Sequence, residues 1–209
     1  MADVTSPDAA RRTREREARR AFVAAALKDP GMVAAVLPSS GQLAEALAAV
    51  VPTTVAPIVA ELGPGTGVVS GRILDRLSAG GRHLAVDLNP SMVAYLRRVH
   101  PELDVVEGDA RHLVEILQER GIDHLDAVVS GLPWAVFPDS LQHDILTAVC
   151  EALTPEGAFT TFAYLHGLPL AAARRFRARL EAMFAETTIS RPVWRNVPPA
   201  VVYVCRTPR

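Results

Sequence analysis

Short apolar runs alternate with amphipathic stretches from residue 56 to the C-terminus, and this alternation predicts an α/β fold. The apolar runs are short enough for buried strands, and the amphipathic stretches are long enough for several helical turns. The expected strands cover 56–62, 83–88, 103–107, 126–130, 157–164, 187–192 and 200–206. The expected helices cover 66–77, 90–99, 111–120, 138–153 and 169–184. Repeated βα units predict a doubly wound, mostly parallel sheet with helices on both faces. The last two strands, separated by a short proline-containing loop, predict an antiparallel hairpin at one edge.

The first 55 residues have a different pattern. We expect a disordered tail over 1–8, followed by a helix over 9–27 that carries six arginines between Arg11 and Arg20. A short segment follows at 32–37, and Ser39 or Ser40 can cap a further helix over 41–50. We therefore divide the chain into the tail, N-terminal helices over 9–55 that we expect to cover the cleft, and an α/β domain over 56–209.

Composition adds limits on compartment and chemistry. Hydrophobic residues make up 49% of the chain and aromatic residues only 5%, which suits a core of alanine, valine and leucine. Cys150 and Cys205 lie in separate apolar runs, so we expect two buried, reduced thiols and no bound metal. The N-terminus lacks the apolar segment of a signal peptide, and prolines interrupt the least charged stretch. These features predict a cytoplasmic protein.

Charge is distributed unevenly along the chain. Residues 56–163 contain 7 basic and 15 acidic residues, whereas residues 164–209 contain 8 basic and 2 acidic ones. The acidic catalytic region argues against nucleic acid as a partner. The basic C-terminal quarter fits either a solvated basic helix or a surface that meets a phosphate or lipid headgroup.

A glycine-rich turn follows the first expected strand and reads Glu61-Leu62-Gly63-Pro64-Gly65-Thr66-Gly67. Glycines at such a turn let the backbone approach a ligand at the carboxyl end of a strand. The dinucleotide pattern GxGxxG needs glycine at position 68 or 70, where Val68 and Ser70 stand. A phosphate-binding P-loop is excluded as well, because no Gly-Lys-Ser/Thr follows.

The turn resembles the first motif of the class I methyltransferases that use S-adenosylmethionine (AdoMet) and release S-adenosylhomocysteine. In that family an acid after the second strand binds the ribose hydroxyls, and an acid after the third strand binds the adenine amino group. Asp87 and Asp109 match these positions, although either is also typical of a loop acid or a helix N-cap. The resemblance implies a cofactor site made of Glu61, Gly63, Gly65, Gly67, Asp87, Leu88, Asp109, Ala110 and Ser130.

Three further segments resemble the bacterial phospholipid N-methyltransferases that act on phosphatidylethanolamine. They read Pro-Ser-Ser at 38–40, Ser-Gly-Leu-Pro at 130–133 and Asn-Val-Pro-Pro-Ala at 196–200. A more distant resemblance is to rRNA adenine dimethyltransferases. Trp134 and Gly41-Gln42 depart from the lipid enzymes, in which we expect an aliphatic and a basic residue.

These resemblances imply an enzyme that N-methylates an amine such as the phosphatidylethanolamine headgroup, with a peripheral contact on the inner face of the membrane. A soluble small-molecule acceptor is the alternative, ahead of an RNA base. Ser130, Tyr164 and His166 are the candidates for handling amine hydrogens. For substrate binding we single out Ser39, Trp134, whose indole face suits a cation, and Arg195, which with Arg191 suits an anion. The same residues also fit packing or solvent-exposed roles.

Overall fold

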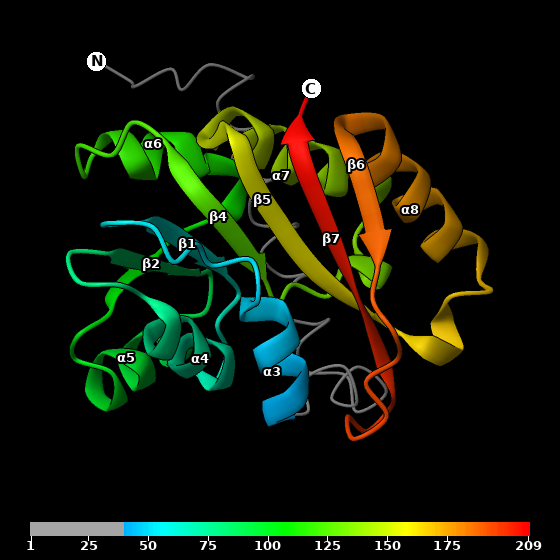
Figure 1. Ribbon diagram of the computed structural model, residues 1–209, viewed down its shortest axis with the longest axis horizontal. Helices are drawn as coiled ribbons and strands as arrows, with labels where there is room; N and C mark the ends of the chain where they lie inside the picture. The colour runs from blue at the N-terminus through cyan, green and yellow to red at the C-terminus, as the bar shows by residue number, and fades with distance from the viewer. Residues whose placement is uncertain (1–39) are drawn as a thin grey trace, which may run out of the picture. The chain divides into compact units, whose positions relative to one another are not determined.

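The computed structural model describes residues 40–209, which Figure 1 traces from blue to red. The chain divides into two compact units, Met1–Leu37 and Pro38–Arg209. The expected tail at 1–8, the expected segments at 9–27 and 32–37, and Ser39 lie outside the described residues. None of the helices between residues 40 and 209 is both long and apolar enough to cross a bilayer.

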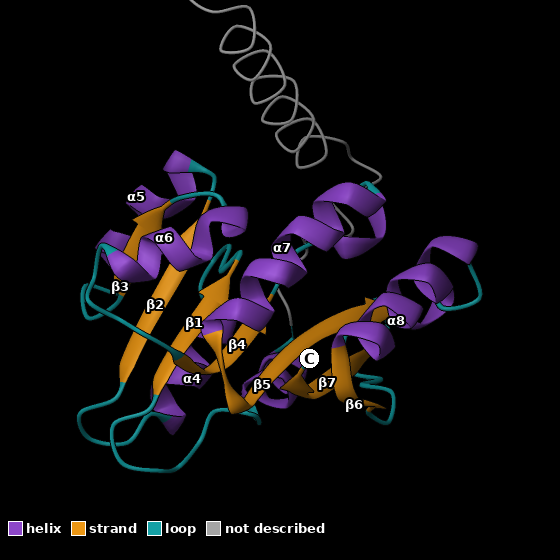
Figure 2. Ribbon diagram, turned by 90° about the horizontal axis from the view of Figure 1, so that it is seen from above, coloured by secondary structure: helices purple, strands orange, loops and turns teal. Residues whose placement is uncertain are grey.

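Seven strands form one sheet in the order β3-β2-β1-β4-β5-β7-β6, and the strands are labelled in Figure 2. The strands are β1 (Ile58–Leu62), β2 (Arg82–Asp87), β3 (Asp104–Glu107), β4 (Leu125–Ser130), β5 (Leu153–Tyr164), β6 (Phe184–Ile189) and β7 (Ala200–Pro208). Neighbours among β1 to β5 are parallel, and β7 is antiparallel to both β5 and β6. The mostly parallel sheet and the antiparallel hairpin are therefore confirmed, with β6 rather than β7 at the edge.

Helices cover both faces of the sheet. They are α3 (Gly41–Ala48), α4 (Val68–Arg76), α5 (Pro90–Val99), α6 (Leu113–Gln118), α7 (Asp139–Ala152) and α8 (Ala171–Met183), with short 3-10 turns η1 (Ala110–His112), η2 (Trp134–Val136) and η3 (Leu165–Gly167). The α3, α4 and α5 helices pack on one face. The α7 and α8 helices lie on the other face, opposite α4 (Figure 2). Crossover connections between parallel strands are right-handed in nearly all proteins, which places the connecting helices on the faces of the sheet.

Each face has its own core. On the first face, Leu43 and Leu47 of α3 pack against Val59, Val129 and strand residues nearby. On the second face, aromatic rings form the centre of the packing. Their closest pairs are Trp134–Phe176, Phe159–Phe184 and Trp134–Phe159.

Several expected boundaries in the first half of the fold differ by one or two residues, and two of the differences have a clear physical reason. The first strand begins at Ile58 rather than at Ala56, because Ala56 has φ of 52° and an extended conformation starts only after Pro57. The expected helix over 111–120 is divided into η1 and α6, since Asp109 caps a 3-10 turn before the α-helix begins.

Boundaries also differ in the C-terminal half. The expected helix over 169–184 ends at Met183, and the following strand begins at Phe184 rather than Thr187. Phe184 is buried and stacks on Phe159, which fixes the start of that strand. The strand expected over 157–164 begins at Leu153, and its first residues form an irregularity in the register of β5 with β4.

Candidate functional site

The glycine-rich turn joins β1 to α4 at the carboxyl ends of the parallel strands. Gly63, Gly65 and Gly67 have φ of 69°, 55° and 82°, a conformation that L side chains rarely adopt. The amide of Gly67 donates to the carbonyl of Pro64 at 3.0 Å and closes the turn. A Cβ added at Gly65 would meet no atom within 4 Å. The tip of the turn therefore has both the backbone and the space that a ligand needs.

The segment after β4 packs directly beneath this turn. The amide of Gly131 donates to the carbonyl of Leu62 at 2.8 Å. A Cβ added at Gly131 would lie 2.6 Å from the carbonyl oxygen of Gly63, and the Leu132 side chain covers Gly63 from the same side. Glycine at position 131 is thus required by the close approach of two backbones from different loops.

Asp87 links the end of β2 to the same turn. One carboxylate oxygen accepts from the amide of Asn89 at 2.8 Å, and the other accepts from the amide of Gly65 at 3.4 Å. Burial raises the pKa of Asp87, the two amides partly oppose that effect, and the charge of Glu61 adds to it. Leu88 follows in the partly buried loop. A carboxylate can accept further hydrogen bonds beyond these two, so Asp87 keeps acceptor capacity for ligand hydroxyls.

Asp109 stands after β3 and caps η1. Its carboxylate accepts from the amide of Arg111 at 3.0 Å and binds the guanidinium, with Nη2 to Oδ2 at 2.6 Å. Burial by itself would raise the pKa of Asp109, but the hydrogen bonds and charge of Arg111 outweigh burial and lower it. The N-cap role is therefore present in the structure. Adenine binding by Asp109 and by the partly buried Ala110 stays a prediction.

Glu61 faces the interior below the turn and is 1% exposed. Its Oε2 accepts from the Ser70 hydroxyl at 2.7 Å, which fixes the first turn of α4. His83 Nε2 lies 3.1 Å from the same oxygen, but the ring is not oriented for a hydrogen bond. The His83 ring therefore approaches Glu61 closely without a hydrogen bond between them. Sequence reasoning missed His83, because a histidine within an apolar strand has no local feature that marks its partner.

Ser130 ends β4 and lies beneath Trp134. The Ser130 hydroxyl oxygen accepts from the Trp134 ring at 3.1 Å and from the Leu132 amide at 3.3 Å. Trp134 is 2% exposed and stacks on Phe176 with ring centroids 5.0 Å apart. Phe176 occupies one indole face, so the structure gives Trp134 a packing role. Its role in holding a cationic amine stays a prediction.

Tyr164 and His166 lie at the end of β5. Their rings stack with centroids 5.8 Å apart, and burial raises the pKa of Tyr164. The amide of Leu165, between them, donates to the carbonyl of Pro199 at 2.8 Å. This hydrogen bond joins the end of β5 to the 196–200 segment.

Asn196 begins the Asn-Val-Pro-Pro-Ala segment, but sequence reasoning gave this residue no role of its own. It is polar yet only 4% exposed. Its side-chain oxygen accepts from the amide of Ser40 at 2.9 Å, and its nitrogen donates to the carbonyl of Pro198 at 2.7 Å. Ser40 in turn caps α3 by accepting from the amide of Leu43. Two segments that the resemblance named, Pro-Ser-Ser and Asn-Val-Pro-Pro-Ala, therefore meet through one side chain.

The remaining predicted residues are not joined to these contacts. Arg195 and Arg191 are exposed in the segment between β6 and β7. Between residues 40 and 209, no group of histidine, cysteine, aspartate or glutamate side chains has the arrangement of a metal site. The structure thus brings together Gly65 with Asp87, and Ser130 with Trp134.

Two comparisons with known proteins both match methyltransferases. The family profile of a methyltransferase domain matches residues 59–157. An ornithine lipid N-methyltransferase from Singulisphaera acidiphila is 36% identical over 188 residues, which is 88% of this chain and 94% of that protein.

Solved structures with the same fold include the O-methyltransferase TomG from Streptomyces achromogenes in complex with AdoMet. Its TM-score is 0.64 at 15% identity, over 82% of each chain. TrmN from Thermus thermophilus has a TM-score of 0.58 at 19% identity, over 80% of this chain, which spans about half (48%) of TrmN. These two likenesses concern the fold alone.

Proposed function

The chain belongs to the class I AdoMet-dependent methyltransferases, and on this premise we propose that its methyl acceptor is the amine of a polar lipid headgroup. The observation that carries the proposal is the 36% identity to an ornithine lipid N-methyltransferase, which extends over 88% of this chain rather than over the cofactor motif alone. Ornithine lipid and phosphatidylethanolamine both present a primary amine, so either is a candidate acceptor.

The carboxyl edge of the sheet fits AdoMet. The open tip at Gly65 provides space beside a backbone that can approach the methionine part of the cofactor. Asp87, already oriented by two amides, would accept the ribose hydroxyls. Asp109 and the amide of Ala110 would hold the adenine. Glu61 would act indirectly, since its buried carboxylate supports the start of α4.

When bound, AdoMet would supply a sulfonium-bound methyl group open to in-line attack by the amine lone pair, with S-adenosylhomocysteine as the leaving group. The nitrogen must be unprotonated to attack, so the protein has to hold and orient a neutral amine and exclude water. Ser130 already accepts two hydrogen bonds, which occupy both lone pairs and leave its hydroxyl as a donor. Tyr164, with a raised pKa, stays protonated near neutral pH. The exposed His166 or water is then left to take the amine proton.

The segments at 38–40, 130–133 and 196–200 support an acceptor site at the carboxyl edge of the sheet. Asn196 joins the start of α3 to the 196–200 segment, and Pro199 joins that segment to the end of β5. Gly131 brings the segment after β4 against the glycine-rich turn. We infer that these segments surround the place where the headgroup amine meets the methyl group.

The test uses the purified full-length chain with methyl-labelled AdoMet and detergent micelles containing one lipid at a time. Ornithine lipid and phosphatidylethanolamine are the two arms, and phosphatidylcholine, whose nitrogen is already quaternary, is the blank. We expect label in the lipid fraction in at least one arm, and much less label with Asp87→Asn, which should bind AdoMet at least tenfold more weakly. AdoMet binding by calorimetry without transfer to either amine lipid would contradict the lipid acceptor.

A further inference from the structure

The segment between β6 and β7 has an inverted distribution of polarity. The polar Asn196 is 4% exposed, whereas Trp194 is 68% and Val197 is 74% exposed. Exposing large apolar side chains while burying an amide opposes the usual distribution of residues in a protein that faces only water. The exposed side chains of Trp194 and Val197 therefore suggest a surface that binds a partner.

The backbone of this segment is held in place by its own hydrogen bonds. The amide of Val193 donates to the carbonyl of Ala200 at 2.7 Å, and the amide of Asn196 donates to the carbonyl of Val193 at 3.2 Å. The Asn196 side chain adds the two contacts to Ser40 and Pro198. Trp194 and Val197 thus project from an anchored turn.

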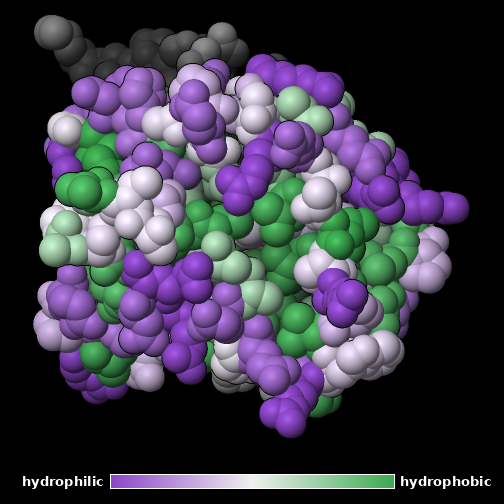
Figure 3. Space-filling view, viewed as in Figure 1, coloured by the Kyte–Doolittle hydropathy of each residue, from purple (hydrophilic) through white to green (hydrophobic). Residues whose placement is uncertain are grey.

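The same edge of the sheet carries this turn and the cofactor motif. The β6 strand ends and β7 begins there, beside the end of β5, and Figure 1 shows the segment (orange to red) near α3 below the sheet. Leu170, which is 62% exposed, lies before α8 on the chain that leaves β5 at this edge. Figure 3 shows hydrophobic residues gathered over the region of β5 and β7. We call Leu170, Arg191, Trp194, Arg195 and Val197 the apolar-basic rim.

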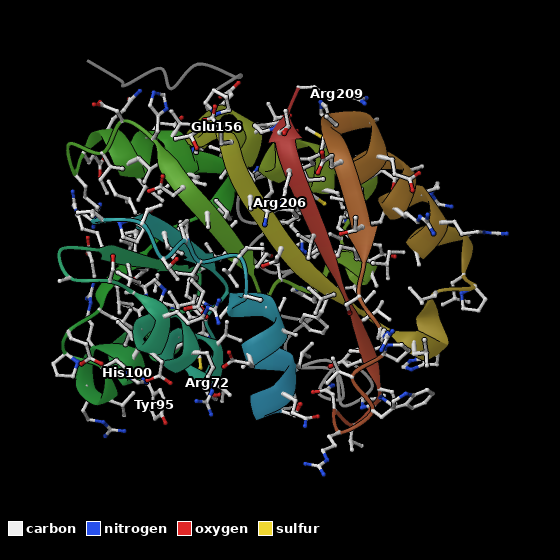
Figure 4. The ribbon with its side chains drawn as sticks, viewed as in Figure 1. Arg72, Tyr95, His100, Glu156, Arg206 and Arg209 are labelled. Atoms are coloured by element: carbon white, nitrogen blue, oxygen red, sulfur yellow. The ribbon has the colours of Figure 1, made fainter. Side chains whose placement is uncertain are left out.

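The positive charge of the rim favours an anionic partner. Arg191 and Arg195 are exposed, and no carboxylate among residues 40–209 lies within ion-pair distance of either. The sequence contains no aspartate or glutamate after Glu186. Arg209 does not contribute, because it lies toward the opposite end of β7 (Figure 4). A surface with exposed tryptophan, aliphatic side chains and arginines that no carboxylate between residues 40 and 209 pairs matches the anionic surface of a bilayer.

We propose that the apolar-basic rim docks this chain on an anionic phospholipid bilayer. Trp194 and Val197 enter the boundary between headgroups and acyl chains, while Arg191 and Arg195 contact lipid phosphates. Docking in this orientation turns the carboxyl edge, with the glycine-rich turn and Asp87, toward the headgroups. The biological sense of this docking rests on the proposed lipid acceptor, but vesicle binding can be measured without any transfer of methyl groups.

Binding to vesicles is the direct test. Full-length protein is sedimented at low salt with vesicles of phosphatidylcholine alone, or of phosphatidylcholine mixed with phosphatidylglycerol. We expect binding to the mixed vesicles, a partition coefficient about tenfold lower for Trp194→Ala, and one about fivefold lower for Arg191→Gln or Arg195→Gln. The arginine effects should vanish on phosphatidylcholine alone, because that surface has no net charge.

Matched controls lie at the amino ends of the parallel strands, opposite the carboxyl edge. Val55, 92% exposed before β1, and Arg82, exposed at the start of β2, give Val55→Ser as the partner of Val197→Ser and Arg82→Gln as the partner of Arg191→Gln. We expect wild-type binding from both controls. Tryptophan emission should shift to the blue on vesicles, and Trp194→Phe should abolish that shift, since Trp134 is buried. The docking surface is wrong if rim and control variants bind equally well, or if Trp194→Ala instead abolishes self-association.

Activity in micelles separates this proposal from the lipid acceptor. Dispersed lipid substrate needs no bilayer docking, so Trp194→Ala should methylate it at the wild-type rate and lose activity only on vesicles. Vesicle binding that depends on Trp194, without methyl transfer to any lipid, would refute the acceptor and keep the docking surface. Lipid methylation together with vesicle binding that is unchanged in the rim variants would refute the docking surface and keep the lipid acceptor.

Discussion

Gly131→Ala is the most specific test of how the site is built. The added Cβ would lie 2.6 Å from the carbonyl oxygen of Gly63. Real Cβ atoms do not approach that closely, and the obstacle is backbone, so the segments after β1 and β4 must move apart. Overpacking of this kind costs about 1–3 kcal/mol. For a chain of this size each kcal/mol lowers Tm by about 2–4 °C.

The displacement should also affect the cofactor, because Gly63 begins the turn that we expect AdoMet to contact. A misplaced binding group of this kind weakens binding, and we expect AdoMet affinity by calorimetry to fall about tenfold or more. The control is Gly71→Ala in α4, where an added Cβ meets nothing within 4 Å. Alanine there should stabilise the helix by up to about 1 kcal/mol and leave AdoMet binding unchanged. Gly131→Ala with wild-type Tm and wild-type affinity would refute the close approach as the reason for this glycine.

Three further predictions concern single side chains. Asp87→Asn should weaken AdoMet binding at least tenfold in calorimetry. The folded pKa of Asp87 is raised above its unfolded value, so ionisation of Asp87 lowers the stability of the fold as pH rises. The ligand-free variant should therefore denature at or above the wild-type Tm at neutral pH, and a lower Tm would contradict this. Asn196→Ala leaves the amide of Ser40 without its partner and should cost about 1–3 kcal/mol in chemical denaturation, and wild-type stability would show that water replaces the bond. Trp134→Phe keeps the ring packing but removes the bond to Ser130, so a loss of about 0.5–1.5 kcal/mol is expected, against about 3–5 kcal/mol for Trp134→Ala; equal losses would deny the packing role.

Sequence patterns predicted the fold and much of the cofactor edge because the relevant information is local. A buried strand is a short apolar run, and a turn with positive φ needs glycine, so β1 and the turn through Gly63, Gly65 and Gly67 could be found without coordinates. Asp87 follows its strand directly, and parallel strands place their carboxyl ends at one edge. The boundaries around Phe184 could not be found, because stacking on Phe159 decided where the helix ended.

Side chains of the same type received different roles only through tertiary packing. Trp134 is buried against Phe176, whereas Trp194 is exposed at the sheet edge, although both follow proline-containing or valine-rich segments in the sequence. Which tryptophan belongs to the core depends on α8 arriving from more than 30 residues further along the chain. A local sequence pattern does not extend far enough along the chain to reveal that contact.

By itself the sequence determined the order of strands and helices, the conformation of the glycine-rich turn and the positions of acids after strands. Those properties follow from the preferences of neighbouring residues. Only the tertiary structure decided that Gly131 must lack a side chain, that Asn196 joins Ser40 across 156 positions, and that Trp194 faces outward. The physical reason is that close packing and hydrogen-bond satisfaction are decided between surfaces that meet only after the whole sheet has formed.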